Sequence, residues 1–154
     1  MVRQEGNRLV IEEGLTRVYI ECWGESSLRV RMTAEPEMDK NDWALCEKVE
    51  EVTPVITFTE VDVTDPWYKG EEWKKYHQTG TEATLTNGKI TAEVNPEGWI
   101  RFLNQRGEVL TEEYWRNRNR INRYCVPLRV DARELKPVMG SCDYELTARF
   151  EAYD

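Results

Sequence analysis

The side chains best suited to contact a ligand lie in one aromatic segment, residues 65–78. Its sequence, DPWYKGEEWKKYHQ, places Trp67, Tyr68 and Trp73 among charged residues. Flat aromatic faces beside polar groups can stack on sugar rings and bury a large area at low entropic cost. Exposed aromatics also mark interfaces of other kinds, so packing against a fold or another domain is the alternative. We therefore take Trp67, Tyr68 and Trp73 as candidate carbohydrate contacts.

A second cluster is basic, although the chain as a whole is acidic. The sequence YWRNRNRINRYC carries four arginines within eight residues: Arg116, Arg118, Arg120 and Arg123. Arginine can bind carboxylate or phosphate in a bidentate way. Against a net charge of -8, nucleic acid is not a fitting partner, because binding to phosphates needs a basic surface. These arginines are interpreted as a solvated loop or as a seam against an acidic surface of another domain.

Catalytic groups do not form a recognisable pattern. The single histidine, His77, follows a Glu/Lys-rich stretch and is interpreted as a surface residue, so a Ser-His-Asp or Cys-His mechanism has no base. Glycoside hydrolysis needs two carboxylates about 5–10 Å apart, but no spacing rule selects a pair among 29 acidic residues. Adjacent acids are interpreted as solvated rims of strands: Glu12–Glu13, Glu50–Glu51 and Glu112–Glu113. We predict no catalytic residue, no metal site and no cofactor.

Length and composition bound the class of protein. A chain of 154 residues is expected to form one domain, 1–154, and is large enough to bury a core without disulfides. The four cysteines show neither a CxxC pair nor zinc-ligand spacing, so free thiols are expected. The first ten residues lack an apolar region typical of a signal peptide, and no apolar run reaches membrane-spanning length. We therefore expect a cytoplasmic protein without membrane partners.

Short alternating runs predict an antiparallel β-sandwich with little helix. Apolar residues recur at every second position, with turn residues between the runs. Such runs occupy residues 7–14, 15–23, 27–33, 54–63, 83–94, 99–110, 126–132 and 144–152. About ten short strands are expected, and this density of strands and turns is typical of an all-β sandwich.

Three of these runs carry sharper expectations. Asn87-Gly88 predicts a two-residue hairpin turn of type I′, in which both central residues have positive φ. Residues 54–63 are β-branched on both faces, which predicts a strand covered on both faces. The run 144–152 predicts one half-buried strand with Tyr144, Leu146, Ala148, Phe150 and Ala152 on its inner face. Trp99, after the turn NPEG, is interpreted as a core or rim residue.

The segment NGKITAEVNPEGWIRFLNQRGEVLTEE, followed by YELTARFEAYD, resembles the amino-terminal β-sandwich of glycoside hydrolase family 31, the α-glucosidase and α-xylosidase family. The correspondence includes Phe102, Gly107 and Leu110, and then the run from Phe150 to Asp154. It covers residues 83–154 best. The resemblance implies a galactose-mutarotase-like supersandwich.

The resemblance also implies a larger parent enzyme. In this family the catalytic carboxylates belong to a (β/α)₈ barrel that follows the sandwich, and this sequence holds no matching aspartate motif, so no catalytic residue is carried over. The chain is then expected to be a truncated, non-catalytic domain of a retaining α-glycosidase. Its partner is the catalytic barrel. Oligosaccharide and a second copy of the parent are further candidate partners, and Arg116, Arg118, Arg120 and Arg123 are candidate interface residues.

Two other functions stay open at the level of sequence. A free-standing carbohydrate-binding sandwich would use the exposed aromatics Trp67, Tyr68 and Trp73. A sugar epimerase of the mutarotase kind would share the fold, but its chemistry is usually built on several histidines, and this chain has only His77.

Overall fold

The computed structural model describes residues 1–38, 49–62, 79–113 and 132–152, which form strands and turns and contain no helix. A four-stranded sheet runs in the order β1 (Val2–Glu5), β2 (Arg8–Glu13), β3 (Thr16–Cys22), β4 (Leu28–Thr33). A six-stranded sheet runs in the order β12 (Phe150–Ala152), β9 (Val109–Glu113), β8 (Ile100–Asn104), β7 (Ile90–Val94), β6 (Thr79–Asn87), β5 (Val55–Asp62). The third sheet is a hairpin of β10 (Arg133–Pro137) and β11 (Tyr144–Ala148). Every pairing is antiparallel.

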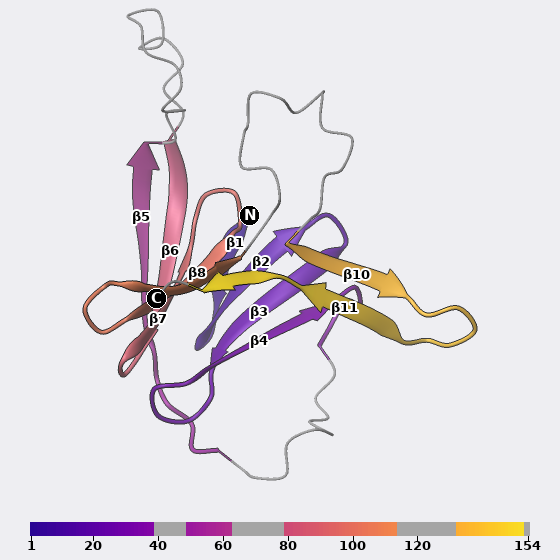
Figure 1. Ribbon diagram of the computed structural model, residues 1–154, viewed down its shortest axis with the longest axis horizontal. Coiled ribbons are helices and arrows are strands. Elements are labelled where there is room, and N and C mark those ends of the chain that lie inside the picture. Colours follow the sequence, from indigo (N-terminus) through magenta and orange to yellow (C-terminus); the bar gives the residue numbers. More distant parts are fainter. Residues whose placement is uncertain (39–48, 63–78, 114–131, 153–154) are drawn as a thin grey trace, which may run out of the picture.

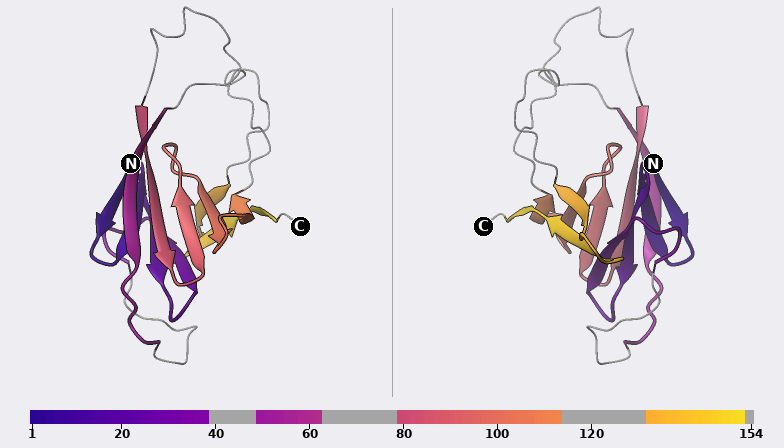
Figure 2. Two further views of the ribbon diagram at one scale, coloured as in Figure 1. Left: turned by 90° about the vertical axis from the view of Figure 1, so that its left-hand side faces the viewer. Right: turned by 90° about the vertical axis from the view of Figure 1, so that its right-hand side faces the viewer.

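The two larger sheets pack face to face as a sandwich, and Figure 2 shows these layers from two sides. Alternation places one side of each strand in the shared core. The four-stranded sheet contributes Leu9, Ile11, Val18 and Ile20 to this core, and the six-stranded sheet contributes Ala83, Leu85, Ala92, Val94 and Ile100. All nine are at most 1% exposed. The predicted all-β antiparallel sandwich is confirmed, and the alternating residues Leu9, Ile11, Val18 and Ile20 lie in its core.

The hairpin at residues 87–90 forms, but its turn differs from the prediction. Asn87 pairs with Ile90, so the two connecting residues are Gly88 and Lys89. Gly88 has a φ of 58°, whereas Asn87 does not have positive φ. The buried Asn87 side chain instead donates to the carbonyl oxygens of Gly24 (2.7 Å) and Ser27 (2.8 Å). This amide therefore ties the end of β6 to the turn between β3 and β4, across the two sheets.

The prediction that residues 54–63 are covered on both faces is wrong. β5 is the last strand of the six-stranded sheet and pairs only with β6. Val55 on one face is 64% exposed, and Phe58 on the other is 43% exposed. β-branched residues favour any pleated strand, at an edge as well as in the centre, so composition alone did not distinguish the two.

The run at residues 144–152 also differs from its prediction, because it forms two strands in two sheets. β11 pairs with β10, and after Arg149 the chain enters the six-stranded sheet as β12, beside β9. The apolar face predicted to be half-buried is largely exposed on β11, and Phe150 on β12 is 44% exposed. Figure 1 shows the β10–β11 hairpin extending away from the two larger sheets. We call this hairpin the arm.

Some predictions fall outside the described residues or on the rim of the fold. The predicted strand at 126–132 lies almost wholly outside them. Trp99 is half-buried, as expected of a rim residue, and its amide donates to the Asn95 side chain at 2.9 Å. Cys22 is a half-buried free thiol, whereas Cys142 in the arm's turn is exposed. The described residues contain no helix long and apolar enough to span a membrane.

Candidate functional site

The arm has one apolar and one polar face, because residues paired across two antiparallel strands point to the same side. Leu135 pairs with Leu146, and Pro137 pairs with Tyr144. These four residues form what we call the apolar arm face. The opposite side carries the pairs Glu134–Thr147 and Lys136–Glu145. A hairpin with this pattern is suited to cover another apolar surface with one side only.

Nothing in the described part of the chain covers the apolar arm face completely. Leu146 is 46% exposed and Tyr144 is 42% exposed, while Leu135 is partly buried. Phe150, just after the arm, is similarly exposed, and its ring lies 6.1 Å from that of Phe102 at the end of the core. Exposed apolar side chains that share one face of a hairpin mark an interaction site more often than a solvated surface.

The root of the arm is anchored to the sandwich by a buried ion pair. The Arg133 Nε lies 3.1 Å from Glu113 Oε1, and both side chains are at least 93% buried, since their exposed fractions are 7% and 1%. The second Glu113 oxygen accepts a hydrogen bond from the Ile100 amide at 2.8 Å. Glu113 ends β9 and Arg133 begins β10, so the pair joins the six-stranded sheet to the arm.

Arg133 continues this network to the other sheet. Its Nη2 donates to Glu13 Oε1 at 2.9 Å and to the Gly98 carbonyl oxygen at 2.6 Å. Nearby, the Arg149 amide donates to the Ala132 carbonyl oxygen at 2.8 Å. The Arg133 guanidinium therefore contacts the end of β2, the turn before β8 and the end of β9. The tip of the arm has no comparable anchor among the described residues.

Burial raises the pKa of the Glu113 carboxyl to about 7, although Arg133 and the Ile100 amide both act to lower it. Removing the carboxylate from water disfavours its charged form, and here this effect is the largest. A perturbed buried acid can belong to a catalytic site. Glu113, however, is enclosed, and its nearest charged partner is Arg133 at the root of the arm. We therefore assign Glu113 a structural role, and we call its ion pair with Arg133 the anchor.

The anchor corrects one prediction from the sequence. Glu112–Glu113 was interpreted as a solvated rim, but Glu113 is only 4% exposed. Alternation along β9 offered a signal, since Thr111 and Glu113 share a face and β9 lies inside its sheet. Using this signal would require knowing that β12 pairs with the outer edge of β9, and the sequence pattern alone does not show this pairing.

The residues singled out as candidate contacts lie outside the described residues. This applies to the aromatic candidates Trp67, Tyr68 and Trp73, to His77, and to the arginines Arg116, Arg118, Arg120 and Arg123. Their roles stay predictions. Within the described ranges, no group of three or more His, Cys, Asp or Glu side chains is placed to hold a metal ion.

Comparison with known proteins gives two relatives, while no protein-family model matches the chain. A Pseudescherichia vulneris protein described as an uncharacterized family 31 glucosidase is 36% identical over 142 residues. That match covers 86% of this chain and 23% of the relative. The crystal structure of a GH31 α-xylosidase from a soil metagenome, complexed with xylose, superposes with a TM-score of 0.71 at 35% identity. It covers 99% of this chain and 21% of that one.

The chain is an antiparallel β-sandwich, and one part of the α-xylosidase structure shares its fold. In sequence and fold it is similar to one part of these two glycoside hydrolase family 31 proteins, which confirms the resemblance seen in its sequence. The chain spans between a fifth and a quarter of the length of the relatives it matches.

Proposed function

We propose that the chain is a non-catalytic domain of a retaining α-glycosidase, an α-glucosidase or α-xylosidase, and that it packs on the catalytic barrel and frames its pocket. The observation that carries this proposal is the exposed apolar arm face, which the exposed Phe150 follows in the chain. A surface of this composition needs an apolar partner. The relatives are four to five times longer than the chain, and so contain the sequence from which such a partner would come.

In this proposal the chain positions a neighbouring domain and does not catalyse the reaction, and the anchored arm supports this role. The arm is tied at its root by Arg133 and Glu113, while its apolar face is largely exposed toward the tip. Such an arm sets the position of a neighbouring domain without supplying chemistry of its own. Hydrolysis by two carboxylates through a covalent glycosyl-enzyme intermediate is then performed elsewhere in the parent enzyme.

The first test is enzymatic. The purified chain, incubated with aryl α-glucosides and aryl α-xylosides, is expected to release no aryl alcohol above the buffer rate. Turnover that co-purifies with the chain and disappears on replacing one of its carboxylates would contradict the non-catalytic assignment. Glu113→Gln and Glu93→Gln are the variants to examine, because these two carboxylates are buried.

The second test addresses the apolar arm face in the chain by itself. An uncovered apolar surface promotes association and binding of apolar dyes. Leu146→Glu is expected to lower both dye fluorescence and self-association in sedimentation velocity. The matched control is Thr147→Glu, which places the same charge on the polar face of the same strand and is expected to change neither. Equal effects of the two variants would show that the arm's apolar side is not the associating surface.

A further inference from the structure

The outer end of the arm is an ordered turn, although the anchor holds only the root. We call residues 138–143, which connect β10 to β11, the arm tip. The Ser141 amide donates to the Val138 carbonyl oxygen at 3.2 Å, and Gly140 has a φ of 83°. These are the features of a type II turn, whose third residue has positive φ. The Val138 amide also donates to the Asp143 carbonyl oxygen at 2.9 Å, which closes the tip.

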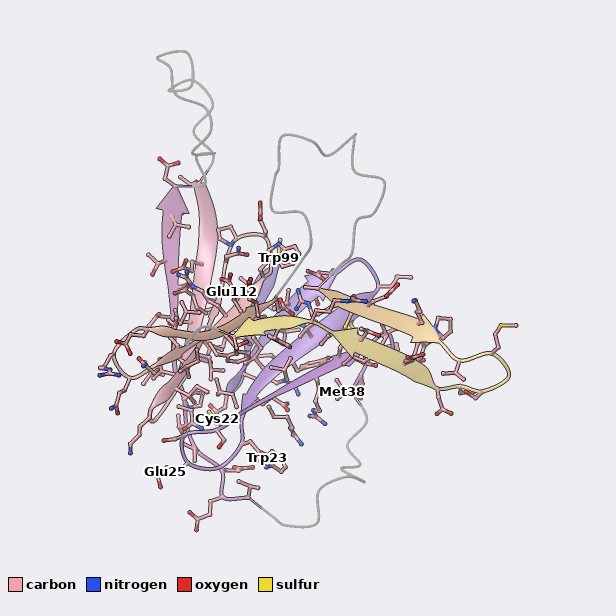
Figure 3. The ribbon with its side chains drawn as sticks, in the orientation of Figure 1. Cys22, Trp23, Glu25, Met38, Trp99 and Glu112 are labelled. Atoms are coloured by element: carbon pink, nitrogen blue, oxygen red, sulfur yellow. The ribbon has the colours of Figure 1, made fainter. Side chains whose placement is uncertain are left out.

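This turn presents apolar side chains to solvent. Met139 is its second residue and is 97% exposed, the largest exposed fraction of any large hydrophobic residue in the described ranges. Val138 is 43% exposed. The residues that favour tight turns are glycine, proline, asparagine, aspartate and serine, so the backbone does not require Val138 or Met139. In Figure 3 the side chains at the end of the arm project beyond those of the sandwich.

The arm tip also extends the apolar arm face. Pro137 and Tyr144 are the last pair of the β10–β11 ladder, so Val138 and Met139 follow directly at its outer end. Among the described residues the arm pairs with no third strand. A two-stranded hairpin is at best marginally stable unless it packs against another surface. The anchor supplies such a contact at the root, and the outer end is left with an uncovered apolar surface.

We propose that the arm tip inserts Met139 into an apolar socket on the remainder of the parent enzyme, so that the arm clasps its partner at its outer end. This inference rests on the proposed function, because the remainder of the parent supplies the socket. The matched regions make up 23% and 21% of the two relatives, so most of an enzyme of that length lies outside this chain.

The chemistry of the tip suits insertion. Methionine is unbranched and has a polarizable thioether, so its side chain fills irregular apolar depressions. The hydrogen bonds of the tip fix its backbone before binding, and docking then orders one side chain rather than a whole loop. A socket for Met139 is lined by aliphatic or aromatic side chains. The polar face of the arm, where Lys136 and Glu134 are paired at 3.1 Å, stays in water.

The test compares the oxidation of Met139 by hydrogen peroxide in this chain and in the full-length parent enzyme, followed by mass spectrometry. In this chain Met139 should react as fast as it does after unfolding in urea. In the full-length enzyme its oxidation should be at least about tenfold slower, because a buried side chain reacts only after local opening. Hydroxyl-radical labelling of Tyr144 in the same samples reports whether the apolar arm face is covered.

The outcomes separate this inference from the proposed function. Protection of both Met139 and Tyr144 in the full-length enzyme supports the inference. Rapid oxidation of Met139 with Tyr144 protected would overturn the socket and leave the proposed docking in place. Exposure of both residues would overturn the two proposals together. Protection of Met139 that disappears on dilution would overturn the inference as well, since the socket would then belong to a second copy.

Variants of the full-length enzyme assign the effect to the Met139 side chain. Met139→Asp is expected to raise the labelling of Tyr144 roughly tenfold, as loss of an interface hot spot would. Met139→Leu keeps an apolar side chain of similar volume and should not raise it. The matched control is Thr147→Asp, which adds the same charge to the polar face of the arm. Equal labelling of Tyr144 in the two aspartate variants would contradict insertion. Met139 is 97% exposed, so the sandwich should tolerate its replacement, and circular dichroism of this chain checks this.

Discussion

Replacing Glu113 by glutamine isolates the energetic cost of burying the anchor carboxylate. In the folded chain burial raises its pKa to about 7, against a reference value of 4.5. The folded state therefore holds a proton on Glu113 more tightly than the unfolded state does. The contribution of this group to stability is fully present below pH 4.5 and is lost as the pH rises to about 7. A difference of this size corresponds to about 3 kcal/mol in the free energy of unfolding.

Urea unfolding of wild type and Glu113→Gln between pH 4.5 and pH 7.5 measures this contribution. Glutamine does not titrate, so wild type should lose about 3 kcal/mol relative to the variant across this range. Other titrating groups are present in both proteins, and the comparison removes their effects. Glu112→Gln is the matched control, because it changes the adjacent carboxylate on the opposite face of β9. The difference in free energy of unfolding between Glu112→Gln and wild type should change by less than about 1 kcal/mol over the same pH range.

The outcome that would refute this reasoning is a difference between wild type and Glu113→Gln that does not vary with pH. Glu113 would then be ionised in the folded chain at every pH tested. In that case the attraction of Arg133 at 3.1 Å and the hydrogen bond from Ile100 would outweigh the cost of burial.

Three further predictions concern the anchor and the aromatic segment. Arg133→Met should destabilise the chain by about 3–5 kcal/mol at pH 8 in urea unfolding, and by less at pH 5, because it leaves Glu113 buried without its cation. Gly98→Ala should cost about 1–3 kcal/mol more than Gly107→Ala: both glycines have positive φ, but only at Gly98 would the added Cβ crowd other atoms, at 3.1 Å and 3.2 Å. If residues 65–78 instead form a carbohydrate site, millimolar maltose or xylose should change tryptophan emission; an unchanged spectrum would speak against this alternative.

The sandwich could be predicted from the sequence because its core follows simple alternation. Leu9, Ile11, Val18 and Ile20 lie where period-two spacing put them, at 0% exposure. The order of strands within sheets was not predictable in this way. Residues 144–152 have one continuous pattern, yet they divide between the arm and β12 at Arg149. Alternation specifies the two faces of a strand but not which sheet will cover them.

The functional features were harder to foresee, since each depends on residues brought together from distant strands. Glu113 and Arg133 are twenty residues apart and meet at the root of the arm. The arginines on the outer face of the four-stranded sheet had a local signal, because Arg29 and Arg31 alternate on β4 and Arg17 precedes Tyr19 by two residues on β3. Only the register of the antiparallel sheet shows that these residues share one face.

The measurement that tests the central claim most directly is the coding sequence of the native gene beyond the codon for Asp154. A domain of a family 31 glycosidase predicts a reading frame that continues for several hundred residues, as the length of the relatives implies. Such a sequence would supply the partner for the apolar arm face. A stop codon at or near Asp154 would contradict the account and leave the chain as a small free-standing sandwich.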